Sequence, residues 1–430
     1  MKNNFQKISL NLNVRGLPQS ATLAINEISD KLRKEGRMIY KLGLGQSPFP
    51  VPQPVVDELK VNAHQKDYLP VTGLPKLREA VADYHCRTHG ICYTADDVLI
   101  GPGSKELMFL LQYTYYGDLV IPTPSWVSYA PQALIIGRQV RWIKTNRDNN
   151  WRLSAEELEE QCKEDETKPR IVILNYPSNP AGVSYNESEL KDIAAVAKKH
   201  KIILLSDEIY GELHHEGKHL SIARYYPEGT IISGGLSKWC GAGGWRLGTF
   251  VFPGNLNGRL KDIMAVMASE TFTSTSAPIQ YAAVRAFKGG SEIENFLWRS
   301  RWILKKLSQT IVSKLLDAGL HICQPDGAFY LFPDFSDVRE SIEKKGIKTS
   351  DELCKKLLED TGVALLPGSA FGRPDEELTA RLAYVDFDGA RAISACKRFK
   401  NSDGIDEQFL NNYCGNILKA IDLICDWIKS

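Results

Sequence analysis

The chain has 430 residues, of which 43% are hydrophobic and 24% charged, and its formal net charge is +1. This length suits two or three structural units, and the balanced charge excludes a general attraction to nucleic acid or to an anionic membrane. No apolar stretch approaches the roughly 20 residues of a membrane span, and none near the N-terminus has signal-peptide length. The nine cysteines show neither a C-x-x-C pair nor zinc-ligand spacing, which favours a reducing compartment. We therefore expect a cytoplasmic protein without a metal site.

The first half of the chain alternates short apolar runs with amphipathic segments. A helix over 21–36 and a strand over 39–44 come first. Apolar runs then fall at 97–100, 119–122, 140–143, 171–175, 202–207, 230–233 and 246–252. The clearest helices between them are 105–113, 154–162 and 187–200. Such alternation predicts an α/β fold, with a mostly parallel seven-stranded sheet between helices.

The C-terminal part has a different pattern. Helical spacing of apolar residues predicts a long helix over about 290–318. Beyond it we expect a smaller α+β domain with strands over 327–333 and 380–386 and helices over 349–360, 388–400 and 406–428. The predicted division is an N-terminal segment (1–50) packed with the small domain, a large cofactor-binding domain (51–310) and the small domain (311–430).

Polar motifs follow several of these strands, where ligands of parallel sheets bind. They are Asn175–Gly182, Ser206–Tyr210, Ser233–Lys238, Gly243–Gly248 and, before a helix, Gly101–Glu106. Alone, each motif is typical of a turn, a helix cap or a surface residue. The glycine pairs at 43–45 and 101–103 lack the third glycine of a dinucleotide-binding loop. Together, the motifs suit pyridoxal phosphate, which needs a lysine for a Schiff base, a carboxylate against its pyridine nitrogen, and an arginine and a helix N-terminus for its phosphate.

These motifs resemble those of the class I/II aminotransferases, which are fold type I pyridoxal-phosphate enzymes, over nearly the whole chain. The matching motifs are Asn179-Pro180-x-Gly182, Asp207-x-x-Tyr210, Ser237-Lys238 and Gly244-Trp245-Arg246, in the family order and at similar spacing. The segments Ser20–Thr22 and Gly45–Phe49 resemble a bacterial branch that contains aspartate and prephenate aminotransferases. The resemblance implies transamination between an amino acid and a 2-oxo acid, as part of amino acid metabolism.

The resemblance also implies a role for each motif residue. Lys238 would be the catalytic lysine that holds the cofactor, with Asp207 at the pyridine nitrogen. The other cofactor contacts would come from Gly103, Ser104, Lys105, Trp126, Asn179, Tyr210, Ser237 and Arg246. Tyr68 would reach the phosphate of a neighbouring subunit, which implies a homodimer with shared active sites. Arg381, with Gly45 and Asn179, would bind the substrate carboxylate, because a guanidinium fork matches a carboxylate in two places.

Four further points concern the family pattern and the reaction. Gly235 stands where many relatives carry a phosphate-binding serine. By the resemblance, Thr123–Pro124 and Asn179–Pro180 should be cis peptides. A β-lyase, a decarboxylase or a non-catalytic binding protein could share the fold. The amino donor is not readable, because the cation for a distal carboxylate could be Arg15, Lys105, a residue of the partner subunit, or none.

Overall fold

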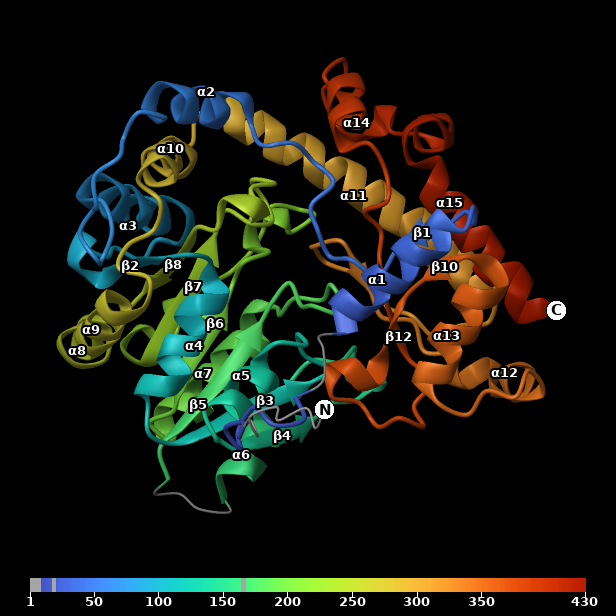
Figure 1. Cartoon of the computed structure of the whole chain (residues 1–430), viewed down its shortest axis with the longest axis horizontal. Coiled ribbons are helices and arrows are strands. Elements are labelled where there is room, and N and C mark those ends of the chain that lie inside the picture. The colour runs from blue at the N-terminus through green and yellow to red at the C-terminus, as the bar shows by residue number, and fades with distance from the viewer. Residues whose placement is uncertain (1–8, 18–20, 164–167) are drawn as a thin grey trace, which may run out of the picture.

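The computed structural model describes residues 9–17, 21–163 and 168–430. Its larger part is built on a seven-stranded sheet in the order β2-β8-β7-β6-β5-β3-β4 (Figure 1). The strands are β2 (Val98–Gly101), β3 (Asp118–Thr123), β4 (Val140–Lys144), β5 (Arg170–Asn175), β6 (Ile203–Asp207), β7 (Thr230–Gly235) and β8 (Gly248–Val251). Only β8 runs antiparallel to its neighbours. All seven strands overlap the apolar runs of the sequence, so the predicted fold class is confirmed.

Alternating side chains on the strands explain why helices cover both faces of this sheet. On β5, Ile171 and Ile173 pack with α4 and α9, while Val172 and Leu174 pack on the opposite face with α6 and α7. A strand that is apolar on both faces buries its side chains only between two helical layers. The helices of this part are α2 (Gln53–Asn62), α3 (Pro75–His89), α4 (Ser104–Thr114), α5 (Tyr129–Ile135), α6 (Ala155–Lys163), α7 (Glu187–Lys199), α8 (Gly254–Leu256), α9 (Asp262–Thr271) and α10 (Ala277–Lys288).

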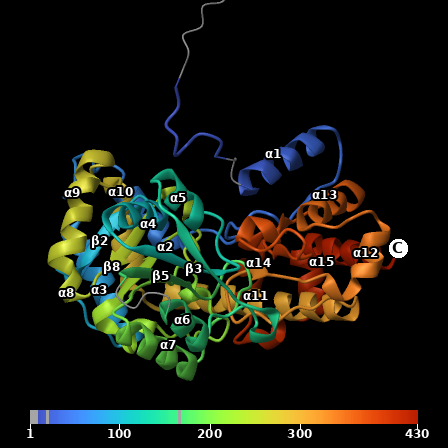
Figure 2. The same cartoon turned by 90° about the horizontal axis from the view of Figure 1, so that it is seen from below.

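The C-terminal part lies beside the large sheet and joins it through a 27-residue helix, α11 (Ser291–Asp317) (Figures 1 and 2). Its antiparallel sheet has the order β11 (Leu366–Pro367), β12 (Ala380–Ala383) and β9 (Tyr330–Leu331). Its other helices are α12 (Arg339–Lys344), α13 (Ser350–Thr361), α14 (Gly389–Cys396) and α15 (Glu407–Lys429). The strands at 327–333 and 380–386 are thus shorter than expected.

The N-terminal segment crosses to this C-terminal part. Helix α1 (Ala21–Lys34) leads into β1 (Tyr40–Lys41), which pairs in parallel with β10 (Val363–Ala364). Strand β1 is shorter than the predicted 39–44. The proposed boundary at 310/311 falls inside the continuous helix α11, so the three-part division stays a proposal.

Two of the cysteines are paired, which the spacing had not indicated. Cys86, in the last turn of α3, forms a disulfide with Cys92, and their Cα atoms are 4.4 Å apart. Gly90 ends the helix in the left-handed conformation (φ 68°), and this turn brings the two cysteines together. Among the described residues, no helix is long and apolar enough to cross a membrane, and no cluster of side chains could hold a metal ion. The cytoplasmic location stays a prediction.

Candidate active site

A cavity of about 430 Å³ opens at the carboxyl ends of the parallel strands. It brings together most of the residues that the sequence predicts for the site. Of these it is lined by Gly45, Ser104, Lys105, Trp126, Asn179, Asp207, Tyr210, Ser237, Lys238 and Arg246. Gln46, Tyr129, Asn175, Ile209, Gly243 and Gly244 complete the wall. The motifs therefore meet where a parallel sheet binds its ligands.

Asp207, the last residue of β6, places a buried carboxylate in the wall of this cavity. The hydroxyl of Tyr129 donates a hydrogen bond of 2.6 Å to its Oδ2, and Ser233 donates one of 3.4 Å to Oδ1. Burial raises the pKa of Asp207 to about 6, although these hydrogen bonds oppose the rise. A cationic N–H group facing this carboxylate would stabilise its charged form. The protonated pyridine nitrogen of pyridoxal phosphate has this chemistry, so Asp207 fits the cofactor.

Lys238 follows β7 and lines the same cavity. Its ammonium group donates a hydrogen bond of 2.7 Å to the carbonyl oxygen of Gly45 and lies 5.5 Å from the ring centre of Tyr210. Tyr210 is itself buried, and burial followed by the nearby Tyr330 holds its pKa well above the usual range. Tyr210 is therefore a neutral hydroxyl at neutral pH, hydrogen-bonded to the hydroxyl of Tyr330 at 2.7 Å.

Positive charge gathers at one end of the cavity, beside the N-terminus of α4. Arg246 donates hydrogen bonds to the carbonyl oxygens of Gly243 (2.9 Å) and Pro102 (3.3 Å), which hold its guanidinium between two loops. Gly103 precedes α4 with φ 93°, and a Cβ there would lie 2.2 Å from Nη2 of Arg246. Only glycine lets the guanidinium approach the helix N-terminus so closely. Burial, followed by repulsion from Arg246 and Lys238, lowers the pKa of Lys105. An anionic group such as a phosphate fits this end.

Arg381 lies on β12, outside the cavity wall, and is 2% exposed. One of its Nη atoms donates to the side-chain oxygen of Asn179 at 3.2 Å, and the other donates to the carbonyl oxygen of Gly43. Its buried Nε has no hydrogen-bond partner among the described residues. Burial lowers the pKa of this guanidinium. Arg381 is thus a buried cation with an unpaired N–H group, and it contacts Asn179 in the cavity wall. Such a group suits the binding of a substrate carboxylate.

Of three further expectations, one is confirmed, one was wrong and one stays a prediction. Tyr68 is 88% exposed and does not line the cavity, so this chain alone does not test its role. The Thr123–Pro124 peptide is cis as expected, but the second cis peptide is Tyr176–Pro177, so the prediction for Asn179–Pro180 was wrong. The chain turns three residues earlier, and the N–H of Asn179 donates a hydrogen bond of 2.7 Å to the side chain of Asn175.

The glycine that departs from the family pattern has a structural reason. Gly235 adopts φ 149°, and a Cβ there would lie 2.6 Å from the carbonyl oxygen of Leu247. A serine at this position would therefore strain the backbone and displace the neighbouring strand. Gly235 has no side chain that could supply the phosphate contact implied by the family resemblance.

Comparison with known proteins decides the family. The family model described as aminotransferase class I and II matches residues 37–386. The chain belongs to this family. Its function is therefore transamination, with an amino acid and a 2-oxo acid as substrates, and the family depends on pyridoxal phosphate.

The relatives of this aminotransferase include enzymes from the bacterial branch that the sequence resembles. It is 36% identical to the aspartate aminotransferase of Geobacillus stearothermophilus, over 86% of this chain and 93% of the relative. It is 31% identical to a probable aspartate/prephenate aminotransferase of Rhizobium leguminosarum, over 90% of this chain and 96% of the relative. The solved structure of the Thermus thermophilus aspartate aminotransferase with maleate superimposes with a TM-score of 0.83 at 26% identity, covering 98% of this chain and 100% of the other.

Two tyrosines of this aminotransferase escaped the sequence interpretation. Tyr129 lies three residues after Trp126, about one helical turn, and its hydroxyl reaches Asp207. That spacing was a signal that could have found it. Tyr330, on β9, contacts Tyr210 and lies 4.9 Å from the guanidinium of Arg381, from a part of the chain 120 residues away from Tyr210. No local pattern indicates such a long-range contact.

Proposed function

We propose that this aminotransferase binds pyridoxal phosphate in the 430 Å³ cavity and uses Lys238 as its catalytic lysine. The observation that carries the proposal is the buried carboxylate of Asp207 in one wall, together with Lys238 and with Arg246 beside the N-terminus of α4 in the others. Bound there, the cofactor would supply a ring that accepts the electrons released when a Cα bond of the substrate breaks.

The residues around the ring would each hold one part of the cofactor. Asp207 would keep the ring nitrogen protonated, and Trp126 would cover a ring face. Tyr210 and Asn179 would donate hydrogen bonds to the ring oxygen. The phosphate would lie at the positive end of the cavity, held by the backbone N–H groups of Ser104 and Lys105 and by Gly103, Ser237 and Arg246, which leaves the ammonium group of Lys105 to the substrate.

The reaction needs a base at the substrate and a fixed carboxylate. The amine of Lys238, released from the carbonyl of Gly45, would take the proton from the substrate Cα and would donate it to C4′ of the cofactor. Arg381 would bind the α-carboxylate through its open Nε and one Nη, assisted by Asn179 and the backbone of Gly45. Holding the carboxylate near the ring plane leaves the C–H bond perpendicular to the ring, which favours transamination.

We further propose that the amino donor is acidic, with aspartate as the first candidate. Lys105 lines the cavity, and its ammonium group lies 5.0 Å from the ring centre of Trp126. Arg246 and Lys238 repel this ammonium group, so an anionic partner would stabilise it. Arg15, the other candidate in this chain, is exposed and does not line the cavity. The Geobacillus relative is an aspartate aminotransferase, and the Thermus structure holds maleate, a dicarboxylate.

A panel of amino donors tests the substrate proposal, with 2-oxoglutarate and oxaloacetate as acceptors. Replacing Lys105 with methionine keeps the length of the side chain and the backbone N–H but removes the charge. The loss of one charged hydrogen bond, about 1.5–3 kcal/mol, should raise the KM for aspartate at least about tenfold. The KM for alanine, which lacks a distal carboxylate, should change little. Equal effects on both donors would show that Lys105 does not recognise the distal carboxylate.

We also propose a homodimer in which Tyr68 completes the active site of the partner subunit. Tyr68 is 88% exposed, and an aromatic side chain left so open within one chain is available to a second copy. Its hydroxyl would add a hydrogen-bond donor to the phosphate and would offset the contact that Gly235 cannot make.

A further inference from the structure

The short turn of residues 368–373 connects β11 to the segment that leads into β12, and it packs against the loop that carries Trp126. Its helical turn, Gly368–Phe371, ends just before Arg373. The N–H of Ser125 donates a hydrogen bond of 3.0 Å to the carbonyl oxygen of Phe371. The 368–373 turn therefore contacts the chain one residue before the aromatic side chain that lines the cavity.

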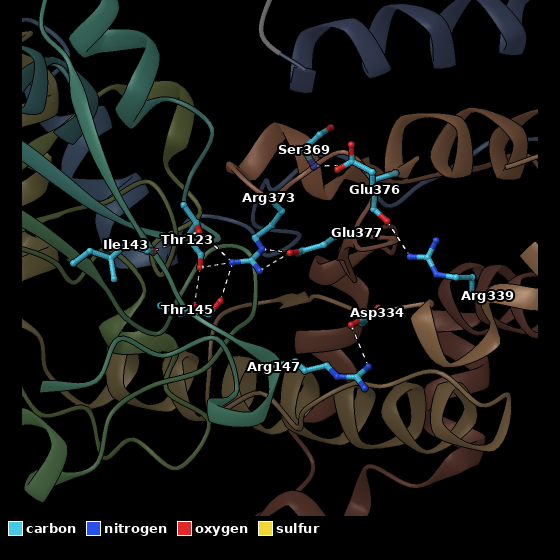
Figure 3. A network of polar contacts seen from close by, with 11 residues as sticks. Thr123, Ile143, Thr145, Arg147, Asp334, Arg339, Ser369, Arg373, Glu376 and Glu377 are labelled. Atoms are coloured by element: carbon cyan, nitrogen blue, oxygen red, sulfur yellow. Dashed lines mark hydrogen bonds and ion pairs between the residues drawn. The ribbon is translucent and has the colours of Figure 1, made fainter. Parts of the chain in front are cut away.

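Arg373 connects the two parts of the structure through its guanidinium (Figure 3). It is 8% exposed, and its Nη1 donates hydrogen bonds to the carbonyl oxygens of Thr123 (3.1 Å) and Thr145 (2.8 Å) and to the hydroxyl of Thr123 (3.1 Å). Its Nε and Nη2 form a fork with the carboxylate of Glu377 at 2.7 and 2.9 Å. The guanidinium thus ties the ends of β3 and β4 to the small sheet.

Thr123 is a sensitive point for such a connection. It is the last residue of β3, and Pro124, Ser125 and Trp126 follow it directly. The carbonyl oxygen of Thr123 also accepts hydrogen bonds from the N–H and the hydroxyl of Thr145. A movement of Arg373 would therefore change the anchor from which the Trp126 loop starts.

The same turn also contacts the proposed carboxylate clamp. The guanidinium of Arg381, a buried cation, lies over the ring of Phe371, 5.1 Å from the ring centre, and so forms a cation–π contact with it. Phe371 thus contacts Arg381 through its ring and Ser125 through its carbonyl group. One short segment joins the residue proposed to bind the substrate to the loop proposed to hold the cofactor ring.

We propose that Arg373 is a positioning residue that couples the carboxylate clamp at Arg381 to the placement of Trp126 on the cofactor ring. When Arg381 binds a carboxylate, the 368–373 turn transmits its shift through Arg373 to Thr123, and the ring contact changes with it. The inference rests on the proposed roles of Trp126 and Arg381. Arg373 binds both carboxylate oxygens of Glu377 through two N–H groups, at 2.7 and 2.9 Å. A lysine could not replace it fully, because an ammonium group cannot hold two oxygens in one plane.

Circular dichroism of the bound cofactor tests this coupling in the holoenzyme, because the signal reports the asymmetric surroundings of the ring. Maleate is the probe, since a dicarboxylate can bind the clamp without donating an amino group. In the wild type, maleate should change the cofactor signal. In Arg373→Met the change should fall to less than about half, and the KM for the amino donor should rise about tenfold, as expected for the loss of a charged hydrogen bond.

Arg147→Met is the matched control. Arg147 also joins the two parts, through ion pairs with Asp334 (3.3 Å, Figure 3) and Asp337 (3.0 Å). Within the described part of the chain, its side chain forms no hydrogen bond or ion pair with Thr123 or Trp126. It should lower the melting temperature and keep the maleate response and the KM within about twofold, because a partly exposed ion pair contributes little beyond stability. Arg373→Lys should restore only part of the response.

The outcomes separate this inference from the proposed function. A wild type without cofactor signal or transamination would contradict the proposed function itself. A working wild type together with an unchanged maleate response in Arg373→Met would overturn the coupling and leave Arg373 a structural residue. If Arg373→Met does not fold, Glu377→Gln keeps a partner for the fork but removes its charge. A full maleate response in Glu377→Gln would then overturn the inference, and a reduced one would support it.

Discussion

Replacing Tyr129 with phenylalanine should shift the pH dependence of cofactor binding upward. Burial raises the pKa of Asp207 to about 6, and the 2.6 Å hydrogen bond from Tyr129 opposes that rise by stabilising the carboxylate. A hydrogen bond to a charged group contributes about 1.5–3 kcal/mol, and 1.36 kcal/mol corresponds to one pH unit, so the midpoint should rise by about one to two pH units. Below the midpoint, Asp207 is neutral and cannot pair with a protonated ring nitrogen.

The same shift has a consequence for stability. The pKa of Asp207 in the folded, cofactor-free protein lies above the usual value of 3.8, so folding favours the neutral acid. Its contribution to stability is fully present below about pH 3.8 and is lost as the pH rises to about 6. Removal of the Tyr129 hydroxyl should extend this loss to higher pH.

Titration of the cofactor-free protein with pyridoxal phosphate between pH 5 and 9, followed by tryptophan fluorescence, measures the midpoint. Tyr384→Phe is the control, because Tyr384 is also fully buried and its hydroxyl donates to the carbonyl oxygen of Ala328, away from Asp207. The control should keep the wild-type midpoint. If Tyr129→Phe keeps it as well, the hydrogen bond does not set the charge of Asp207, and the reasoning is wrong.

Three further predictions follow from the site. Arg381→Lys should keep cofactor absorbance but lose at least about 3 kcal/mol in kcat/KM, because lysine cannot fix the carboxylate plane; normal kinetics with a good donor would assign the carboxylate to another residue. Tyr68→Phe should weaken cofactor binding in equilibrium dialysis, and full activity of a monomer at nanomolar concentration would contradict the shared site. Gly235→Ser should lower the free energy of unfolding by about 1–3 kcal/mol in urea, because φ is 149° and Cβ would meet Leu247; an unchanged value would refute this conformational argument.

Much of the fold could be predicted from the sequence because most strands of the large sheet are buried on both faces. Each appears as a short apolar run, as in Ile171–Leu174. Such a run can be recognised in the sequence without knowing which strands lie beside it. The shorter strands of the small sheet were less clear. Around Tyr330 and Leu331 the apolar run is longer than the two paired residues, since burial by helices and loops continues beyond the hydrogen-bonded ladder.

The site was predicted where motifs are local and missed where contacts are distant. Asp207 ends β6, Lys238 follows β7, and Arg246 precedes the antiparallel strand β8, so topology alone brings them to one edge. Tyr330 and Arg373 reach the site from the C-terminal part, and their contacts depend on how the two parts pack. Sequence spacing contains no information on that packing.

The most direct measurement of the central claim is the absorbance and turnover of Lys238→Ala. Lys238 lines the cavity and donates a hydrogen bond to Gly45, and we propose that the cofactor is linked to this amine. The wild type, incubated with pyridoxal phosphate and then desalted, should keep visible cofactor absorbance and transfer an amino group to 2-oxoglutarate. Lys238→Ala, with an unchanged melting temperature, should lose both, and a Lys238→Ala protein that keeps both would contradict the account.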